Sequence, residues 1–251
     1  MIDEELLMYS RQLLLPEIDI SGQKVLSSSR VVVMGVGGIG GPVVLYLAAS
    51  GIGYLRLVDK DNVDLSNLHR QIIFDQNALG LAKSSEASNR CVAINPFITV
   101  DPWVREINQE SLTYLVDGMD LIIDCTDQFK VRFMINHASL KFKIPVVSGA
   151  ALGLEGQITT IDPRGKSNPC YGCLVPNVEE PERRCSENGV LGPLTGIMGS
   201  ICAVEALGVI LNWPNRLVGR LSRFSVSLMQ WDTFSYKKDP KCSECGGVLY
   251  D

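Results

Sequence analysis

Short apolar runs alternate with longer segments of helical character through the first 150 residues. The runs that predict strands are residues 30–34, 54–59, 97–100, 121–127 and 145–148. The segments that predict helices are residues 42–51, 83–93, 109–116 and 132–142. Apolar strands that alternate with helices are typical of a parallel sheet covered by helices on both faces. The pattern predicts an α/β fold with a Rossmann-like, mostly parallel sheet, whose ligand binds at the carboxyl ends of the strands.

The pattern changes in the C-terminal part of the chain. Residues 157–162 predict one more strand, and residues 221–229 and 231–236 predict an antiparallel pair. Residues 192–211 are apolar over about the 20 residues that a membrane-spanning helix needs. This segment contains Glu205, a proline and several glycines, and no basic flank gives it an orientation. We therefore predict a buried core helix there, and no membrane partner.

The composition allows one large α/β domain. The chain has 251 residues, of which 46% are hydrophobic, and a formal net charge of -5. Because it is acidic and has no long basic run, we expect no nucleic acid partner. The N-terminal sequence MIDEELLMYSRQ lacks the basic-then-apolar order of a secretory signal, which predicts a cytoplasmic protein.

A glycine-rich turn follows the first predicted strand. Gly35, Gly37 and Gly40 form the pattern G-x-G-x-x-G, and Pro42 marks the start of the next helix. The first glycine makes the turn, the second admits a phosphate to the backbone, and the third lets the helix pack on the strand. Because backbone N–H groups at a helix start attract anions, the turn predicts a nucleotide phosphate site. By itself it does not distinguish NAD from ATP.

Polar residues that suit a nucleotide follow the second predicted strand. Asp59 ends this strand, where a carboxylate accepts hydrogen bonds from ribose hydroxyls. Asn67, Arg70 and Gln71 come next, and the planar guanidinium of Arg70 suits phosphate oxygens. Lys83 supplies a point charge for the β- and γ-phosphates. An NAD enzyme needs only the acid, so the cluster favours a nucleotide whose phosphate chain is to be broken.

Two acids lie near the end of the fourth predicted strand. Asp127 is at its tip, where it can reach a Mg²⁺ ion on the phosphates. Asp124 lies inside the apolar run and suits a structural hydrogen-bond acceptor. Asp127 is therefore the predicted magnesium ligand.

The eight cysteines include two CxxC pairs. Cys170 and Cys173 form the first pair, and Cys242 and Cys245 form the second. In a chain without a secretory signal such pairs are more often metal ligands than disulfides. Four thiolates make a closed tetrahedral zinc site without an open position for a substrate. We therefore predict a structural Zn²⁺ ion that attaches the C-terminal tail to the main body.

The other four cysteines stand alone. Cys91, Cys125 and Cys202 have apolar or helical surroundings and are predicted to be core residues. Cys185 lies within residues 176–188, a segment rich in proline and charge that we predict to be a mobile loop. Two neighbouring arginines favour its thiolate, which makes Cys185 a candidate nucleophile. The alternative is an incidental exposed thiol.

Several motifs stand in order along the chain. They are Tyr-Ser-Arg-Gln at 9–12, GVGGIGGP at 35–42, LVDKDNVDLSNLHRQ at 57–71, Lys83, DCTD at 124–127 and the two CxxC pairs. Together they resemble the ThiF/MoeB/HesA family, the bacterial relatives of ubiquitin-activating enzymes. The resemblance runs from about residue 8 to residue 247. It implies a single adenylation domain over residues 1–251. The first half, at about 1–150, would bind the nucleotide. The second half, at about 151–251, would contain the zinc site and the mobile loop and would bind the carrier.

The resemblance implies an activity. Family members use ATP with Mg²⁺ to adenylate the C-terminal glycine of a ubiquitin-like sulfur carrier that ends in Gly-Gly, and they release pyrophosphate. Sulfur transfer follows and needs a separate sulfur donor protein. The residues that would bind ATP are Gly38, Asp59, Ser66, Asn67, Leu68, His69, Arg70, Lys83, Asp127 and Gln128. Arg11 resembles an arginine that reaches the phosphates from the other subunit of a homodimer. The predicted catalytic residues, which would act by positioning and by charge stabilisation, are Arg11, Arg70, Lys83 and Asp127.

Within the family, the segment around Cys185 is more similar to the ThiF branch, which activates a carrier for thiamine thiazole synthesis. The resemblance implies a covalent link between this cysteine and the carrier. MoeB-like activation of the small subunit of molybdopterin synthase is the alternative, as is adenylation of a peptide in a specialised pathway. Gln128 departs from the family, which usually has Asn at this position.

Two other classes of protein share part of the pattern. An NAD-dependent oxidoreductase would have the glycine turn and Asp59, but it leaves Arg70, Lys83 and the zinc unexplained. A non-catalytic partner subunit would have the same fold. Retention of all the predicted catalytic residues in one chain argues against that second alternative.

Overall fold

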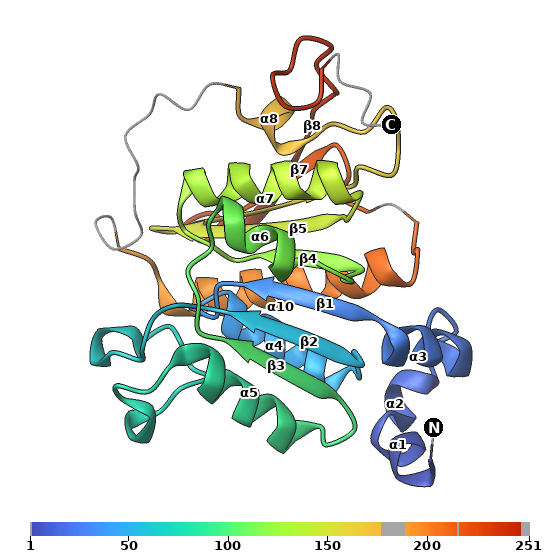
Figure 1. Ribbon diagram of the computed structural model, residues 1–251, viewed down its shortest axis with the longest axis vertical. Coiled ribbons are helices and arrows are strands. Elements are labelled where there is room, and N and C mark those ends of the chain that lie inside the picture. Colours follow the sequence, from blue (N-terminus) through green and yellow to red (C-terminus); the bar gives the residue numbers. More distant parts are fainter. Residues whose placement is uncertain (1, 177–188, 215, 247–251) are drawn as a thin grey trace.

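The computed structural model describes residues 2–176, 189–214 and 216–246 (Figure 1). Within these ranges the strands form an eight-stranded sheet in the order β3-β2-β1-β4-β5-β6-β7-β8. The parallel part consists of β1 (Arg30–Met34), β2 (Tyr54–Val58), β3 (Thr99–Trp103), β4 (Leu121–Asp124) and β5 (Val146–Leu152). The antiparallel part continues with β6 (Glu155–Ile161), β7 (Arg220–Ser225) and β8 (Gln230–Ser235). The predicted α/β fold, with a mostly parallel sheet and antiparallel C-terminal strands, is confirmed.

Helices cover both faces of the sheet, because its central strands are apolar on both sides. Val31 and Val33 of β1 join the core on one face, Val32 and Met34 join the core on the other, and all four are fully buried. The first face carries α4 (Gly40–Ala49), α5 (Lys83–Ile94) and α10 (Gly192–Ile210). The second face carries α6 (Gln109–Leu115), α7 (Phe129–Phe142) and the short α8 (Tyr171–Leu174). Burial on both faces explains why β1 is a continuous apolar run.

Helix α10 lies in the core, as predicted. It packs on α4 and on strands β5 and β6. Its Glu205 is only 6% exposed and accepts hydrogen bonds from the Thr160 hydroxyl at 2.7 Å and the Leu217 N–H at 2.6 Å. Among the described residues this is the helix long and apolar enough to cross a membrane, a test that core helices also pass. The hydrogen bonds of Glu205 therefore fix α10 against β6 and against the segment before β7.

The N-terminal helices were not predicted from the sequence. They are α1 (Asp3–Met8), α2 (Ser10–Leu13) and α3 (Asp19–Ser28), and they lie together beside the start of β1 (Figure 1). Tyr9 between the first two is 3% exposed, and its hydroxyl accepts a hydrogen bond of 2.8 Å from the Asn95 side chain. Two of these helices are short, and α3 mixes polar and apolar residues without a strong period. Tertiary contacts such as that of Tyr9 therefore define this region.

Some predicted boundaries were wrong. The third strand is Thr99–Trp103 rather than residues 97–100, and it includes Pro102. Because β3 is an edge strand, a proline without an N–H group is tolerated there. The fourth strand ends at Asp124, so the following residues form a loop, and α7 begins at Phe129, earlier than predicted.

Candidate active site

The glycine turn brings the start of α4 directly against the end of β1. Gly35 has φ +87°, a backbone conformation that favours glycine. A Cβ atom on Gly40 would lie 2.0 Å from the carbonyl oxygen of Gly35, so no side chain fits there. Gly37 and Gly38 line a cavity at this end of the sheet. The turn thus lies at the start of a ten-residue helix and beside a cavity, a position that suits the binding of an anion.

Asp59 joins the glycine turn to the end of β2. Its two carboxylate oxygens accept hydrogen bonds from the backbone N–H of Val36 at 2.8 Å and of Asp61 at 2.9 Å. Burial raises the pKa of Asp59 above its ordinary value, and these two backbone donors oppose that shift. The carboxylate is therefore held at the mouth of the turn, and its remaining lone pairs can accept further hydrogen bonds.

The polar segment after β2 forms one wall of the cavity. It contains a 3₁₀ helix, η1 (Leu65–Asn67), whose first N–H groups are capped by Asp64. Arg70 donates to the Ser66 carbonyl at 3.0 Å, which holds the guanidinium against this turn. Gln71 is 4% exposed, and its Oε1 has no hydrogen-bond partner within the described residues. A buried oxygen of this kind needs a partner, which a water or a bound ligand could provide.

Lys83 begins α5 and reaches the same cavity. It is 6% exposed, and its Nζ lies 3.2 Å from a carboxylate oxygen of Asp61. Asp61 itself is more than half exposed, so this ion pair neutralises the lysine only in part. A buried ammonium group at the edge of a cavity favours a negatively charged ligand.

The two acids at the end of β4 and in the loop after it differ as predicted. Asp124 is 2% exposed, and it accepts hydrogen bonds from the Thr126 N–H at 3.0 Å and the Ser148 hydroxyl at 2.9 Å. Asp127 is exposed and lines the cavity. Asp124 is thus a structural acceptor, whereas Asp127 is accessible to a ligand. Its role as a magnesium ligand remains a prediction.

The cavity has a volume of about 1170 Å³ at the carboxyl ends of the parallel strands. The predicted site residues that line it are Gly35, Gly37, Gly38, Asp59, Ser66, Asn67, Arg70, Gln71, Lys83, Asp127 and Gln128. The structure therefore brings together residues from five separate segments of the chain.

Other lining residues were not predicted. Lys60, Arg105 and Lys130 add positive charge, and Gln157 and Thr195 lie in the part of the cavity formed by β6 and α10. Lys60, Arg105 and Lys130 closely follow the ends of β2, β3 and β4, and Lys60 belongs to the motif at 57–71 although it was not predicted as a site residue. Their position near the carboxyl ends of parallel strands is the sequence feature that could have predicted them as site residues.

Four predicted site residues do not line this cavity. Gly40 supports the turn from inside the helix, Leu68 packs against the hydrophobic core, and His69 is exposed. Arg11 is exposed on α2 and is also absent from the lining. Cys185 lies outside the described residues. The roles of all these residues remain predictions.

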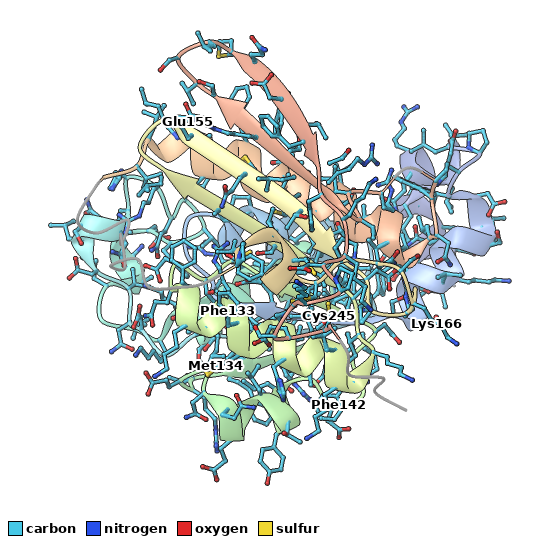
Figure 2. The ribbon with its side chains drawn as sticks, turned by 90° about the horizontal axis from the view of Figure 1, so that it is seen from above. Phe133, Met134, Phe142, Glu155, Lys166 and Cys245 are labelled. Carbon is cyan, nitrogen blue, oxygen red and sulfur yellow. The ribbon has the colours of Figure 1, made fainter. Side chains whose placement is uncertain are left out.

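The two CxxC pairs come together beside α7, where Figure 2 labels Cys245. In Figure 1, α8, which carries Cys173, lies at the other end of the molecule from the N-terminal helices. The sulfur atoms of Cys170, Cys173, Cys242 and Cys245 all lie within 4.8 Å of one another. Neighbouring sulfurs are separated by 3.5 Å, 3.7 Å and 3.9 Å. Tetrahedral coordination at about 2.3 Å from each sulfur requires about 3.8 Å between sulfurs. The cluster therefore fits a closed zinc site, in which the second CxxC anchors the C-terminal segment.

Two of the unpaired cysteines are core residues, as predicted. Cys91 and Cys202 are fully buried, and burial raises the pKa of each thiol to about 12. Cys125 packs against the same core but is partly exposed, because it also lines the large cavity. Burial raises its pKa as well, so none of these three thiols has the reactive thiolate of a nucleophile.

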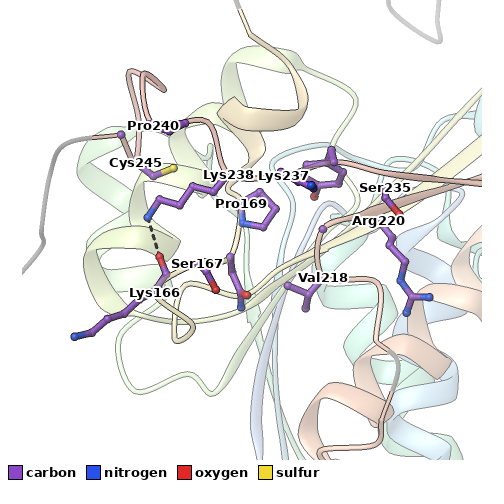
Figure 3. A pocket seen from close by; sticks show the side chains of 14 residues that line it. Lys166, Ser167, Pro169, Val218, Arg220, Ser235, Lys237, Lys238, Pro240 and Cys245 are labelled. Atoms are coloured by element: carbon purple, nitrogen blue, oxygen red, sulfur yellow. Dashed lines mark hydrogen bonds between the residues drawn. The ribbon is translucent and has the colours of Figure 1, made fainter.

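A second cavity, of about 900 Å³, lies beside the cysteine cluster (Figure 3). Lys166, Lys237 and Lys238 are among its lining residues, and the Nζ of Lys238 donates to the Lys166 carbonyl at 3.0 Å. Among the described residues that line it there is neither a glycine turn nor a carboxylate, unlike in the larger cavity. The larger cavity is the candidate active site.

These features define a Rossmann-like α/β protein with a polar cavity at the strand ends and a closed four-cysteine cluster. The chain belongs to the ThiF family, whose model matches residues 9–244. It is 37% identical over 251 residues to the Escherichia coli protein named sulfur carrier protein ThiS adenylyltransferase, covering 100% of this chain and 99% of that protein. It is 36% identical over 244 residues to the Salmonella typhimurium molybdopterin-synthase adenylyltransferase, covering 97% of this chain and 98% of that protein.

The same fold is found in a solved structure. The crystal structure of E. coli MccB superposes with a TM-score of 0.84 at 21% sequence identity, over 99% of this chain and 75% of the MccB chain. At this identity the similarity concerns the fold.

Proposed function

We propose that this chain adenylates the C-terminal glycine of a ubiquitin-like sulfur carrier, using Mg·ATP and releasing pyrophosphate. The observation that carries the proposal is the cavity, which combines an anion-binding turn, a ribose-type acid, two cations and an accessible carboxylate. Relatives that match the whole chain are named as adenylyltransferases of such carriers, which supports the same reaction here.

ATP would lie across the strand ends in this proposal. Asp59 would accept hydrogen bonds from the ribose hydroxyls, since Val36 and Asp61 already orient both of its oxygens. The N–H groups of the glycine turn would face the phosphates. Arg70 and Lys83 would neutralise the β- and γ-phosphates, and Asp127 would hold the Mg²⁺ that accompanies ATP and offsets its negative charge.

The reaction needs positioning rather than a general base. The carrier's C-terminal carboxylate is already ionised, and one of its oxygens attacks the α-phosphorus. The bond between that phosphorus and the bridging oxygen of the β-phosphate breaks, and pyrophosphate leaves with the bond's electron pair. Cations around the phosphates stabilise the negative charge that develops on the leaving group. The buried ammonium of Lys83 suits this role because it is already desolvated.

The carrier would bind through the C-terminal half, about residues 151–251, while residues 1–150 hold the nucleotide. The cavity extends to Ala150, Leu152 and Gln157, which leaves room for a narrow tail next to the phosphates. At the edge of the sheet, β8 and the turn before it expose large apolar side chains. These are Leu228, Met229, Trp231 and Phe234, between 40% and 75% exposed. An exposed apolar strand at a sheet edge is suited to a protein partner.

The branch of the family decides which carrier is used. We favour a carrier of the ThiS type, because residues 180–185 are similar to the ThiF branch. The small subunit of molybdopterin synthase is the second candidate, since the two relatives are 37% and 36% identical to this chain. Exchange assays with one carrier of each type would distinguish them by the ratio of kcat/KM.

A homodimer would complete the site with Arg11 from the second subunit. Mixing Arg11→Ala protein with Asp127→Ala protein tests this. A heterodimer would contain one site with both changes and one site with neither, so part of the activity should return on mixing. If each site used its own Arg11, mixing would restore nothing.

Sulfur transfer after adenylation would involve Cys185 and a separate sulfur donor protein. Cys185→Ala is expected to keep adenylation and to block transfer of sulfur to the carrier. Normal sulfur transfer in this variant would mean that Cys185 is an incidental thiol without a role in the reaction.

The experiment that tests the proposal is ATP–pyrophosphate exchange. It should occur only when a carrier ending in Gly-Gly is supplied, and it should stop when the terminal glycine is removed. Absence of exchange with every such carrier, together with tight binding of NADH, would favour the oxidoreductase alternative instead.

A further inference from the structure

Side-chain amides hold the segment around Arg11 against the rest of the chain. Gln12 directly follows Arg11. Its Nε2 donates to Gln23 Oε1 at 2.6 Å and to the Ser50 carbonyl at 3.1 Å. Gln23 lies on α3, is fully buried, and donates to the same carbonyl at 3.0 Å. Because Ser50 caps the carboxyl end of α4, the two glutamines join α2 and α3 to that end of the helix.

Tyr9 joins the same region to the end of α5. Asn95, directly after α5, is fully buried, and its Nδ2 donates to the Tyr9 hydroxyl at 2.8 Å and to the Ala48 carbonyl at 2.7 Å. Gly51 has φ +82°, and a Cβ atom there would lie 2.6 Å from Gln23 Nε2 and 2.7 Å from the Tyr9 hydroxyl. The backbone after α4 therefore packs directly on both side chains and fixes them in place.

These contacts lie at the opposite ends of α4 and α5 from the large cavity. α4 begins beside the glycine turn, and α5 begins with Lys83, which lines the cavity. Their 10 and 12 residues make them about 15 Å and about 18 Å long. In Figure 1 the N-terminal helices lie beside the start of β1, whereas the cavity is at the strand ends. An extended arginine side chain is shorter than either helix, so Arg11 does not reach the cavity of its own subunit.

The surface that carries Arg11 suits a contact with another protein chain. Arg11 itself is exposed on α2. Large apolar side chains of the N-terminal helices and the turn between them are between 54% and 77% exposed, namely Leu7, Leu14 and Ile20. Exposed apolar side chains next to polar ones are typical of protein contacts. A second copy of this chain that packs on the surface would receive the Arg11 guanidinium.

We propose that Tyr9 and Gln12 are positioning residues, which hold Arg11 for use in the cavity of a second copy of this chain. A guanidinium on a fixed support loses less conformational freedom when it binds phosphate oxygens than one on a mobile segment. The inference rests on the proposed function, because it assumes that Arg11 stabilises the phosphates of ATP in that second cavity. Neither positioning residue would touch ATP or the carrier.

The first test uses two conservative variants. Gln12→Met keeps the length of the side chain and removes its donors, and Tyr9→Phe keeps the ring and removes the hydroxyl. Each should lower the kcat of carrier-dependent ATP–pyrophosphate exchange about fivefold, as expected for the loss of one hydrogen bond. Both proteins should still unfold in a single transition above the assay temperature.

A heterodimer separates a positioning role from a general structural one. Gln12→Met and Asp127→Ala chains are co-expressed with different affinity tags, and the mixed dimer is purified through both. It contains one intact cavity, served by a normally held Arg11, so it should exchange faster than the Gln12→Met homodimer. A folding defect in the Gln12→Met chain would stay with its own cavity, and the mixed dimer would then be slower than that homodimer.

Ser29→Ala is the matched control in the same region. Its hydroxyl is 7% exposed and donates to the Val25 carbonyl at 2.7 Å, a contact local to the end of α3. Exchange by this variant should equal that of the wild type.

The heterodimer of Arg11→Ala with Asp127→Ala is the reference for the outcomes. If this reference is active while Gln12→Met and Tyr9→Phe keep the wild-type kcat, or while the Gln12→Met heterodimer is the slower one, the positioning role is overturned and the proposed function stands. An inactive reference would also overturn the inference, because Arg11 would then not act in a second copy. Absence of exchange in the wild type would overturn the proposed function itself.

Discussion

The candidate active site and the cysteine cluster are both assembled from distant segments, but only the active site has polar groups with capacity left for a ligand. Each collects residues from distant segments: the cavity from five parts of the chain, and the cluster from two CxxC pairs 72 residues apart. In the cavity, Gln71 Oε1 has no hydrogen-bond partner in the part of the chain that the structure describes, and Asp127 is exposed. In the cluster, the four sulfurs already have the spacing of a closed metal site.

This difference separates two kinds of residue. Polar groups in the cavity have capacity left for a ligand, so their replacement should affect binding and catalysis more than folding. The cysteines would direct their thiolates at one ion, so their replacement should affect folding more than chemistry.

The largest effect is expected for Asp127→Ala. Loss of the magnesium ligand should lower carrier-dependent exchange by about 100-fold or more, with little change in the unfolding temperature. Asp124→Asn, three residues earlier, is the paired control. Because Asp124 is buried and accepts from Thr126 and Ser148, this change should destabilise the fold. The contrast fails if Asp127→Ala keeps its exchange activity.

Cys170→Ser should have the opposite profile. Loss of a zinc ligand is expected to lower the free energy of unfolding by about 4 kcal/mol or more, measured by denaturant titration. At saturating ATP and below the unfolding transition, kcat should change little. Cys91→Ser replaces a buried thiol outside the cluster and should neither release zinc nor destabilise as much. Equal stability of Cys170→Ser and wild type would remove the structural role of the metal.

Lys83→Met should raise the KM for ATP by about tenfold, because a desolvated ammonium next to the phosphates is lost while the length of the side chain is kept. Lys60→Met removes a second cation of the same cavity, one that is 52% exposed and paired with Glu106 at 2.7 Å. An exposed ion pair contributes little, so its effect should be within about twofold. Similar effects of the two changes would mean that burial of Lys83 is unimportant.

The smallest effect concerns Asp59 and pH. Burial raises its pKa in the folded chain, so its contribution to stability is present at low pH and is lost as the pH rises through that raised value. The side chain of Asp59→Asn does not titrate. The unfolding temperature of this variant should therefore increase relative to that of the wild type as the pH rises from acid toward neutral. Its ATP binding should be weaker at neutral pH. A difference in unfolding temperature that is the same at every pH would contradict the raised pKa.

The sequence predicted the parts of the fold that follow from short-range pattern. Strands such as β1 are continuous apolar runs because both faces of the sheet are covered, and the glycine turn needs glycine for steric reasons at Gly35 and Gly40. The zinc cluster followed from the spacing of its cysteines. The family resemblance is confirmed by the match over residues 9–244.

The remaining features depend on tertiary structure. The N-terminal helices are defined by contacts such as that between Tyr9 and Asn95, which no local pattern indicates. Arg132 looks like an ordinary helix residue in the sequence, yet it is buried and donates hydrogen bonds to the carbonyls of Thr126 and Gly149. Polar residues of this kind become predictable only when the neighbours that bury them are known.

The most direct test of the central claim is mass spectrometry of the carrier after incubation with the enzyme and Mg·ATP. The account predicts a carrier whose mass has increased by one adenylate group, present with the wild type and absent with Asp127→Ala. An unmodified carrier, with the wild-type protein folded and ATP bound, would contradict it.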